Sequence, residues 1–220
     1  MMISPEGYYE ASLKGKSQQE VLKEIRSLKR EINRLKRYIE EHSLEKEDIF
    51  PSRLTRLKCN IEYLERAIQA YREAGGEYIL TKAERRRQDF DVALDSIERL
   101  VLSIGGYFGG YETRTYTVTD DNVLLNVDHT LEMKPSDLPL CCPFTKAEFI
   151  TGLKKIHIGE WTRNYIDPYI LDGTQWELEI YFGGDKKPLK ISGSNAYPYN
   201  FSDLIALLGI DEEEPEEEQD

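Results

Sequence analysis

Two stretches near the N-terminus carry apolar residues at alternating spacings of three and four. The first contains Val21, Ile25, Leu28, Ile32, Leu35 and Ile39, and the second contains Leu54, Leu57, Ile61, Leu64, Ile68 and Tyr71. This spacing places an apolar seam along one side of a helix and is typical of coiled coils. It predicts two helices of about 22 residues, each about 33 Å long.

The ends of these helices are also marked in the sequence. Ser17 and Glu20 fit a capping box at the start of the first helix, and Gly75-Gly76 can end the second. Because about ten residues between His42 and Pro51 interrupt the pattern, an antiparallel hairpin is expected. The same seam could instead pair two copies in a coiled-coil dimer. Residues 1–16 show no periodicity and are expected to run loosely.

A third helix is predicted after the hairpin. Thr81 and Glu84 form a second capping box, and Phe90, Leu94, Ile97, Val101 and Ile104 follow at helical spacing. The helix is expected to end at Gly105-Gly106. It could pack on the hairpin or cover a sheet, and the pattern favours neither.

The rest of the chain reads as strands and short helices. Segments 113–119 and 123–133 flank Asp120-Asp121-Asn122 and predict a β-hairpin, and Pro135 to Pro143 is expected to be loop. A third capping box at Thr145 opens a helix through Ile156. Trp176, Leu178 and Ile180 alternate with polar residues, which predicts a half-buried strand paired with 188–191. A helix over 201–208 closes the chain.

These elements predict an α+β fold. An N-terminal antiparallel helical hairpin and a third helix precede a small antiparallel sheet with covering helices. The expected domains are residues 1–76 for the hairpin, 77–210 for the α+β domain and 211–220 for an acidic tail.

The charge is concentrated at one end. The chain carries a formal net charge of −12, and eight of its last ten residues are acidic. Such a segment cannot bury apolar surface, so residues 211–220 are expected to be disordered. The three cysteines are an odd number without a secretory pattern, and no apolar run approaches the ~18 residues that cross a bilayer. A cytoplasmic protein that does not enter membranes is expected.

No familiar catalytic set is visible in the sequence. His42, His129 and His157 stand far apart, and the adjacent Cys141 and Cys142 lack a nearby basic partner. The scattered aspartates fall mainly in turns, where Asp bonds the backbone. The glycine-rich run 105–110 follows a predicted helix rather than a strand, so a flexible connector is expected instead of a phosphate loop. We therefore expect no metal, no cofactor and no enzymatic activity.

Two surfaces could bind a partner. The predicted first helix carries Arg26, Arg30, Arg34 and Arg37, which could contact the phosphates of a nucleic acid. Interleaved glutamates and the lack of aromatic residues for base stacking favour a solvated coiled-coil face instead. Arg85-Arg86-Arg87 forms a shorter basic cluster with the same two interpretations.

The second surface lies in the C-terminal half. Trp161 and Trp176 accompany four residues predicted to bind a protein partner: Arg163, Tyr165, Asn195 and Tyr197. Amphipathic aromatic residues beside Arg and Asn are common in protein-recognition surfaces. The alternative interpretation is structural, with the tryptophans in the core and 195–198 as a turn.

The two ends of the chain resemble a family of bacterial proteins of no assigned activity, mostly from Firmicutes and often encoded near mobile elements. The resemblance rests on Tyr8-Tyr9, 13–16, 25–32, Trp161, Arg163, Tyr165, 171–176 and 193–201, about a third of the chain. It implies a bacterial or phage source. We therefore expect a non-enzymatic interaction protein that inhibits or regulates a nucleic-acid-handling or defence complex, in the manner of an anti-CRISPR protein. The alternative is a protein that binds nucleic acid through the basic face of the first helix.

Overall fold

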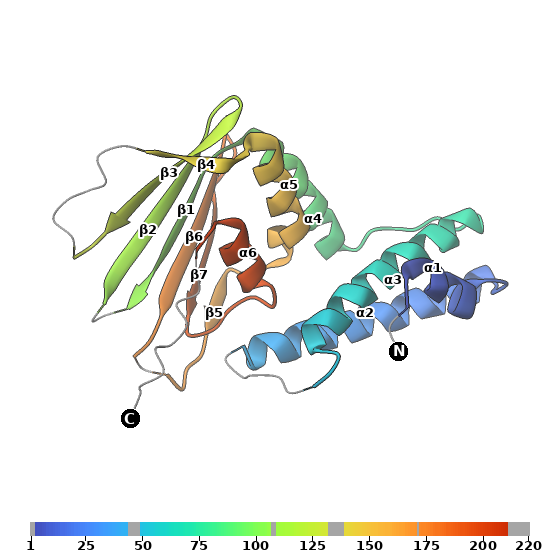
Figure 1. Cartoon of the computed structure of the whole chain (residues 1–220). Helices are drawn as coiled ribbons and strands as arrows, with labels where there is room; N and C mark the ends of the chain where they lie inside the picture. Colours follow the sequence, from blue (N-terminus) through green and yellow to red (C-terminus); the bar gives the residue numbers. More distant parts are fainter. Residues whose placement is uncertain (1–2, 44–48, 107–108, 132–138, 171, 211–220) are drawn as a thin grey trace. The chain divides into compact units, whose positions relative to one another are not determined.

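The computed structural model describes residues 3–43, 49–106, 109–131, 139–170 and 172–210. The fold is α+β, with N-terminal helices and a seven-stranded mixed sheet. The chain divides into two compact units, Met1–Leu80 and Thr81–Asp220. Figure 1 shows the helices of the first unit and the sheet of the second. The predicted acidic tail, 211–220, lies outside the described residues.

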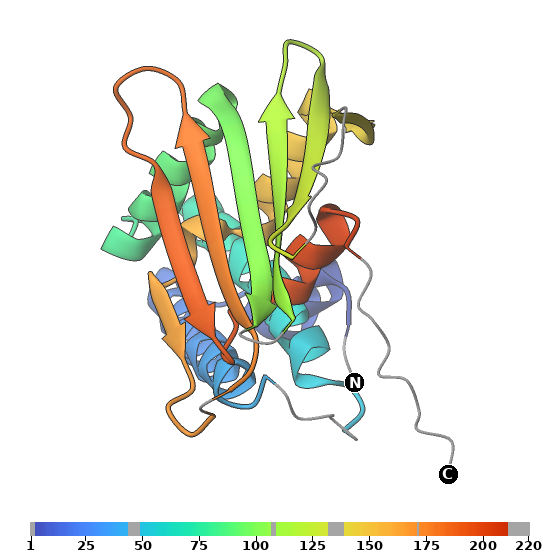
Figure 2. The same ribbon diagram turned by 90° about the vertical axis from the view of Figure 1, so that its left-hand side faces the viewer.

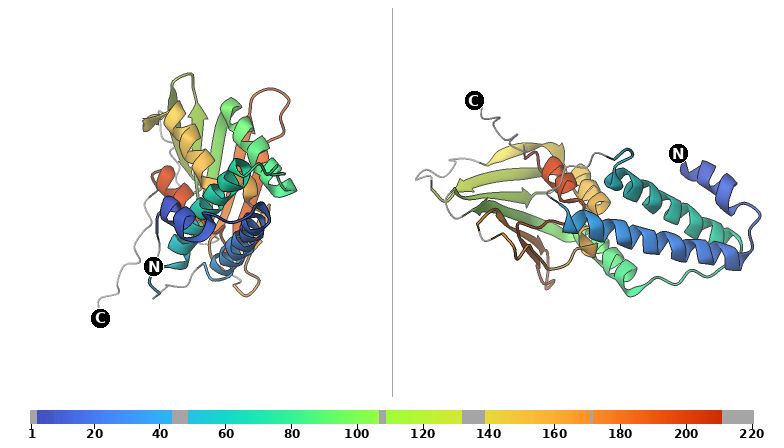
Figure 3. Two further views of the ribbon diagram at one scale, coloured as in Figure 1. Left: turned by 90° about the vertical axis from the view of Figure 1, so that its right-hand side faces the viewer. Right: turned by 90° about the horizontal axis from the view of Figure 1, so that it is seen from below.

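The first unit is built around α2 (Gln18–Glu41) and α3 (Arg53–Glu73), which run side by side in both views of Figure 3. The capping box of Ser17 and Glu20 forms as predicted. The seam residues of α2 are buried: Val21, Ile25, Leu28, Ile32 and Leu35. Gln18 Nε2 donates to the carbonyl oxygen of Ala74, and Arg56 pairs with Glu31 at 3.3 Å. Residues near the start of α2 therefore contact the end of α3.

The segment before α2 is ordered, so the expectation that residues 1–16 run loosely is wrong for its described part. Ser4 caps α1 (Pro5–Tyr8), which continues into a π-helical turn, η1 (Tyr9–Leu13). The Tyr8 ring stacks on Tyr63 of α3 at 4.4 Å between ring centres, and the Tyr8 hydroxyl donates to Glu24 Oε1 at 2.6 Å. The segment has no helical period because it packs through two aromatic rings and a turn.

The predicted seam of α3 is shifted around the helix. Its buried residues are Leu57, Tyr63, Ala67 and Ala70, whereas Ile61, Leu64 and Ile68 are half-buried. The reason is that α3 packs against two elements, α2 and the Pro5–Leu13 segment. The three-and-four spacing of apolar residues in α3 reflects only the side that contacts α2. Small alanines at 67 and 70 provide room for the N-terminal segment.

The third predicted helix is too long. Helix α4 (Lys82–Ala93) begins at the predicted capping box of Thr81 and Glu84, but a 3-10 turn, η2 (Leu94–Ser96), ends it. Residues Ile97–Gly106 form strand β1. The spacing of Ile97, Val101 and Ile104 fits a helix, yet Leu100 and Leu102 also alternate and are fully buried. Long-range pairing with strands on both sides decides the outcome in favour of a strand.

The sheet has the strand order β4-β3-β2-β1-β6-β7-β5. Its remaining strands are β2 (Gly110–Val118), β3 (Asn122–His129), β4 (Leu140–Thr145), β5 (Asn164–Ile166), β6 (Gln175–Phe182) and β7 (Leu189–Ser194). The predicted hairpins β2–β3 and β6–β7 are confirmed as antiparallel pairs. The prediction of a purely antiparallel sheet is wrong, because β5 pairs with β7 in parallel.

Two predicted loop regions contribute to strands. Cys141, Cys142 and Pro143 belong to β4 at one edge of the sheet, where a proline is tolerated. Gly105, Gly106 and Gly110 lie in the β1–β2 hairpin rather than in a connector after a helix. A Cβ atom on Gly105 would meet the carbonyl oxygen of Gly110 at 2.1 Å, so the hairpin requires glycine there.

Helices cover one face of the sheet. Figure 1 shows α4, α5 (Lys146–Ile156) and α6 (Phe201–Leu207) on this side. Their side chains pack with Leu100, Tyr116 and Leu178 of the sheet. Figure 2 shows the other face, and none of the unit's described helices lies in front of it. That face is polar, with a hydroxyl contact of 3.0 Å between Ser103 and Thr113, which suits exposure to water.

Candidate functional site

The predicted partner patch of the α+β unit is centred on Trp176. This side chain is only 2% exposed, and its Nε1 donates to the carbonyl oxygen of Ala196 at 3.0 Å. Its ring packs against Trp161, Tyr165, Tyr197 and Phe201. A Cβ atom on Gly193 would meet Trp176 Nε1 at 2.1 Å, so glycine is needed beside the indole. The residues form an aromatic cluster on the helix-covered side of the sheet.

Asn195 lies at a special backbone position next to this cluster. Its φ angle is 54°, a left-handed conformation that asparagine adopts more readily than most residues. Its N–H donates to the carbonyl oxygen of Thr174 at 2.9 Å, which joins the end of β7 to the segment before β6. The side chain is 7% exposed.

The four residues predicted to bind a protein therefore differ in their exposure to solvent. Tyr165 and Asn195 are buried, so their side chains do not offer a surface, and the binding of a protein partner by the four residues stays a prediction. Tyr197 is half-buried and packs on Phe201 with ring centres 5.1 Å apart. Arg163 is exposed beside the edge strand β5. Later in the same segment, Ile166 and Tyr169 are 68% and 92% exposed, and no sequence motif predicts either of them.

The basic residues of the first predicted helix lie on one exposed face of α2. Arg26, Arg30, Arg34 and Arg37 are all exposed. Each stands two residues from a buried seam residue, which at about 100° per residue places it about 160° around the helix. Lys23 and Asn33 are exposed on the same side. We call Lys23, Arg26, Arg30, Asn33, Arg34 and Arg37 the arginine face.

Three of the glutamates interleaved in this helix, Glu20, Glu24 and Glu31, are engaged by other side chains, whereas Glu41 is exposed beside the arginine face. Glu20 closes the capping box with Ser17. The Glu24 carboxylate accepts a hydrogen bond from the Tyr8 hydroxyl. The Glu31 carboxylate forms ion pairs with Arg34 at 2.8 Å and with Arg56 at 3.3 Å. Within the described part of the chain, no carboxylate forms an ion pair with Arg26, Arg30 or Arg37. The glutamates therefore neutralise the arginine face less than their number in the sequence indicates.

A shallow groove marks the C-terminal half of the arginine face. Its volume is about 430 Å³, and it is lined by Arg30, Asn33, Arg34, Arg37, Tyr38 and Glu41. Tyr38 lies in an aromatic and cationic stack, with the His42 ring 4.0 Å and the Arg53 guanidinium 3.9 Å from its ring centre. Three arginines and one glutamate thus line the groove, and this excess of positive charge suits an anionic oxygen ligand.

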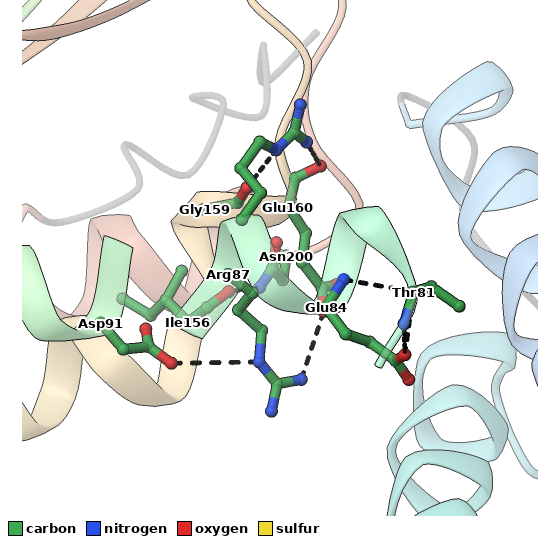
Figure 4. A network of polar contacts seen from close by, with 9 residues as sticks. Thr81, Glu84, Arg87, Asp91, Ile156, Gly159, Glu160 and Asn200 are labelled. Atoms are coloured by element: carbon green, nitrogen blue, oxygen red, sulfur yellow. Dashed lines mark hydrogen bonds and ion pairs between the residues drawn. The ribbon is translucent and has the colours of Figure 1, made fainter. Parts of the chain in front are cut away.

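Two of the three residues in the other basic cluster, Arg86 and Arg87, have a structural role. Arg86 donates to the carbonyl oxygens of Gly159 and Glu160, and Arg87 donates to Glu160 Oε1 at 3.2 Å. Figure 4 shows Arg87 between Asp91 and Glu160. Burial raises the pKa of the Asp91 carboxyl above its usual range. Arg86 and Arg87 therefore join α4 to the 3-10 turn η3 (Ile158–Glu160).

A wider cleft lies at the end of the sheet where β1 turns into β2. It encloses about 570 Å³ and is lined by the glycines of that turn, Glu112, His129 and Asp172. The Glu112 carboxylate accepts Arg114, and His129 Nε2 lies 3.7 Å from Glu112 Oε2. No sequence motif predicts this pair, because cross-strand pairing brings the two residues together.

The cysteines and histidines are dispersed. Burial, and then the neighbouring Cys141, raise the pKa of the Cys142 thiol, which disfavours the reactive thiolate. Among the residues that the structure describes, no group of three metal-ligating side chains converges. The described helices include none that combines the length and the apolar character needed to cross a membrane.

Comparisons of the chain with protein families, curated proteins and solved structures found no match.

Proposed function

We propose that this chain is a non-enzymatic interaction protein that binds nucleic acid through the arginine face of α2. The observation that carries the proposal is the separation of charge on this helix. Exposed arginines occupy the side opposite the seam, and Arg26, Arg30 and Arg37 form no ion pair with the described residues, while Glu24 and Glu31 are engaged by Tyr8, Arg34 and Arg56. A row of cations of this kind attracts the phosphate backbone and gains affinity by releasing counterions.

The dimensions of the face fit this partner. Lys23 and Arg37 are 14 residues apart, which corresponds to about 21 Å along the helix axis. That length matches about six phosphates of one strand at 3.4 Å per nucleotide. The negative net charge of the whole chain does not oppose the proposal, because eight of the twelve excess charges lie in the last ten residues.

The test compares two sets of four substitutions in the full chain. In the first, Arg26, Arg30, Arg34 and Arg37 become Gln. In the matched control, the exposed Lys82, Arg85, Lys155 and Lys187 become Gln, so the net charge changes equally. Fluorescence anisotropy with a labelled nucleic acid should show a loss of more than about tenfold for the first set only. Equal losses, or no binding by the unsubstituted chain, would contradict the proposal and leave α2 with a solvated face.

A protein partner at the edge of the sheet is the second candidate. Arg163, Ile166 and Tyr169 are all exposed and lie close together in the sequence, and exposed apolar side chains can anchor an interface. The resemblance to proteins encoded near mobile elements supports a regulator or inhibitor of a bacterial nucleic-acid-handling or defence complex. If Arg163→Ala and Tyr169→Ala abolish capture of a purified host complex while nucleic-acid binding persists, the result favours a protein partner at this edge of the sheet.

The oligomeric state and the cellular location of the protein can also be proposed. We propose that α2 and α3 form an antiparallel hairpin within one chain, since Gln18 bonds to Ala74 and Arg56 pairs with Glu31. Sedimentation should then give a monomer, and a dimer would favour an intermolecular coiled coil. A cytoplasmic location fits the free thiols of Cys59, Cys141 and Cys142.

A further inference from the structure

We infer that the groove of the arginine face binds the phosphate backbone of a duplex and does not read bases. This inference rests on the proposed function. It specifies which part of the arginine face binds, the groove, and which form of nucleic acid it binds, a duplex. Its starting point is the groove formed by Arg30, Asn33, Arg34, Arg37, Tyr38 and Glu41.

The cations of the groove are spaced along one side of the helix. Arg30, Arg34 and Arg37 follow at intervals of four and three residues, or about 6 Å and 4.5 Å along the axis. Arg34 is oriented by its pair with Glu31 at 2.8 Å, while its side chain stays 70% exposed. Guanidinium groups bind phosphate oxygens in a bidentate manner, so neighbouring phosphates of one strand can be held together.

The aromatic residue of the groove already has two planar partners. The His42 ring lies 4.0 Å from the Tyr38 ring centre at an interplanar angle of 7°, and the Arg53 guanidinium lies 3.9 Å from the same centre. A base that stacked on Tyr38 would have to compete with these two groups for the ring.

This stack decides between single-stranded and double-stranded partners. Proteins that bind single strands without sequence preference stack bases on aromatic side chains, and each stacked base adds substantially to affinity. In a groove with three arginines and a tyrosine that already contacts His42 and Arg53, that contribution is reduced. The groove retains the electrostatic contribution, which a duplex supplies most strongly through its higher charge density. The structure thus favours binding that depends on backbone charge and is independent of sequence.

The experiment uses the full chain and two double variants. Arg34→Gln with Arg37→Gln alters the groove, whereas Lys155→Gln with Lys187→Gln removes the same charge from exposed positions outside the arginine face. Probes are labelled 30-base-pair DNA duplexes of two unrelated sequences, the matching RNA duplex, each single strand, and heparin as a polyanion without phosphate. Circular dichroism confirms that both variants keep their helices.

We expect the groove variant to lose more than tenfold in duplex affinity and the control less than threefold. The two DNA sequences should bind equally within threefold, and each single strand more weakly than its duplex. Equal losses in the two variants, tighter binding of single strands, or a tenfold preference for one sequence overturns this inference while nucleic-acid binding itself stands. Tighter binding of heparin than of either duplex also overturns it, because phosphate geometry would then be irrelevant. No binding of any probe removes the proposed function as well.

Discussion

At the scale of single residues, the aromatic cluster shows that residues typical of binding surfaces can instead belong to the core. Trp176 is the buried anchor that its alternating strand predicts. Tyr165 and Asn195 share the same neighbourhood but serve packing and a left-handed backbone position. Amphipathic residues are used both in interfaces and in cores, so their identity does not reveal exposure. Only the fold separates buried Asn195 from exposed Arg163.

Gly193→Ala tests the close packing of this cluster. The added Cβ atom would lie 2.1 Å from Trp176 Nε1 and 2.7 Å from the carbonyl oxygen of Ala196, so the strand or the indole must shift. We expect a loss of about 1–3 kcal/mol in the free energy of unfolding, as overpacking causes. Gly109→Ala is the control, since its Cβ atom would meet nothing within 4 Å. Urea unfolding measures both, and equal stabilities would refute the packing described for Trp176.

At the scale of elements, local signals are reliable and long-range contacts are not visible in the sequence. The capping boxes at Ser17, Thr81 and Thr145 form because each involves only residues within one turn. Helix α4 ends earlier than its spacing predicts, because β1 gains hydrogen-bonded neighbours on both sides. Strand β5 has only three residues, too few to show an alternating pattern in the sequence, and it forms only by pairing with β7 of the sheet.

The exposure of the arginines can be predicted from the α2 seam, because they lie on the opposite side of the helix. The partners of Glu24 and Glu31, Tyr8 and Arg56, lie in other elements and cannot be predicted in this way.

The N-terminal segment is predicted to stabilise the helical unit. Tyr8→Ala removes the stack on Tyr63 and the hydrogen bond to Glu24, and it leaves a cavity in the core of the first unit. We expect a loss of about 3–5 kcal/mol, typical of a buried aromatic residue. Tyr8→Phe keeps the ring and should lose only about 1 kcal/mol with the hydrogen bond. Thermal unfolding checks both, and an unchanged Tyr8→Ala variant would show that the segment is not part of this core.

Tyr116 links the sheet to α6 and gives the second unit a dependence on alkaline pH. Its hydroxyl donates to the carbonyl oxygen of Leu208 at 2.7 Å, and burial raises the pKa of Tyr116 to about 12. The unfolded chain loses this proton near pH 10, so the stabilisation is complete below pH 10 and is lost between pH 10 and 12. Tyr116→Phe should be less stable by about 1 kcal/mol at pH 7 and should lose less stability than the unsubstituted chain between pH 10 and 12. Parallel stability curves in that range would contradict the assignment.

At the scale of the whole molecule, the two units have separate cores. One joins Tyr8, Leu28 and Ala67, and the other joins Phe90, Tyr116 and Trp176. Because each core is complete within its unit, residues 81–210 alone should unfold cooperatively. Circular dichroism and a single thermal transition would support this. A molten or aggregated fragment would show that the second unit depends on the first.

The central claim is that the arginine face neutralises phosphates, and the salt dependence of binding measures this most directly. Duplex affinity is measured by anisotropy from about 50 to 200 mM salt for the full chain and for the variant in which Arg26, Arg30, Arg34 and Arg37 become Gln. Each neutralised phosphate contributes about −0.9 to the slope of log affinity against log salt. We predict a slope of about −3 to −4 for the full chain and a slope closer to zero by about one for each lost contact. A slope that is near zero, or that is the same in both proteins, would contradict the account.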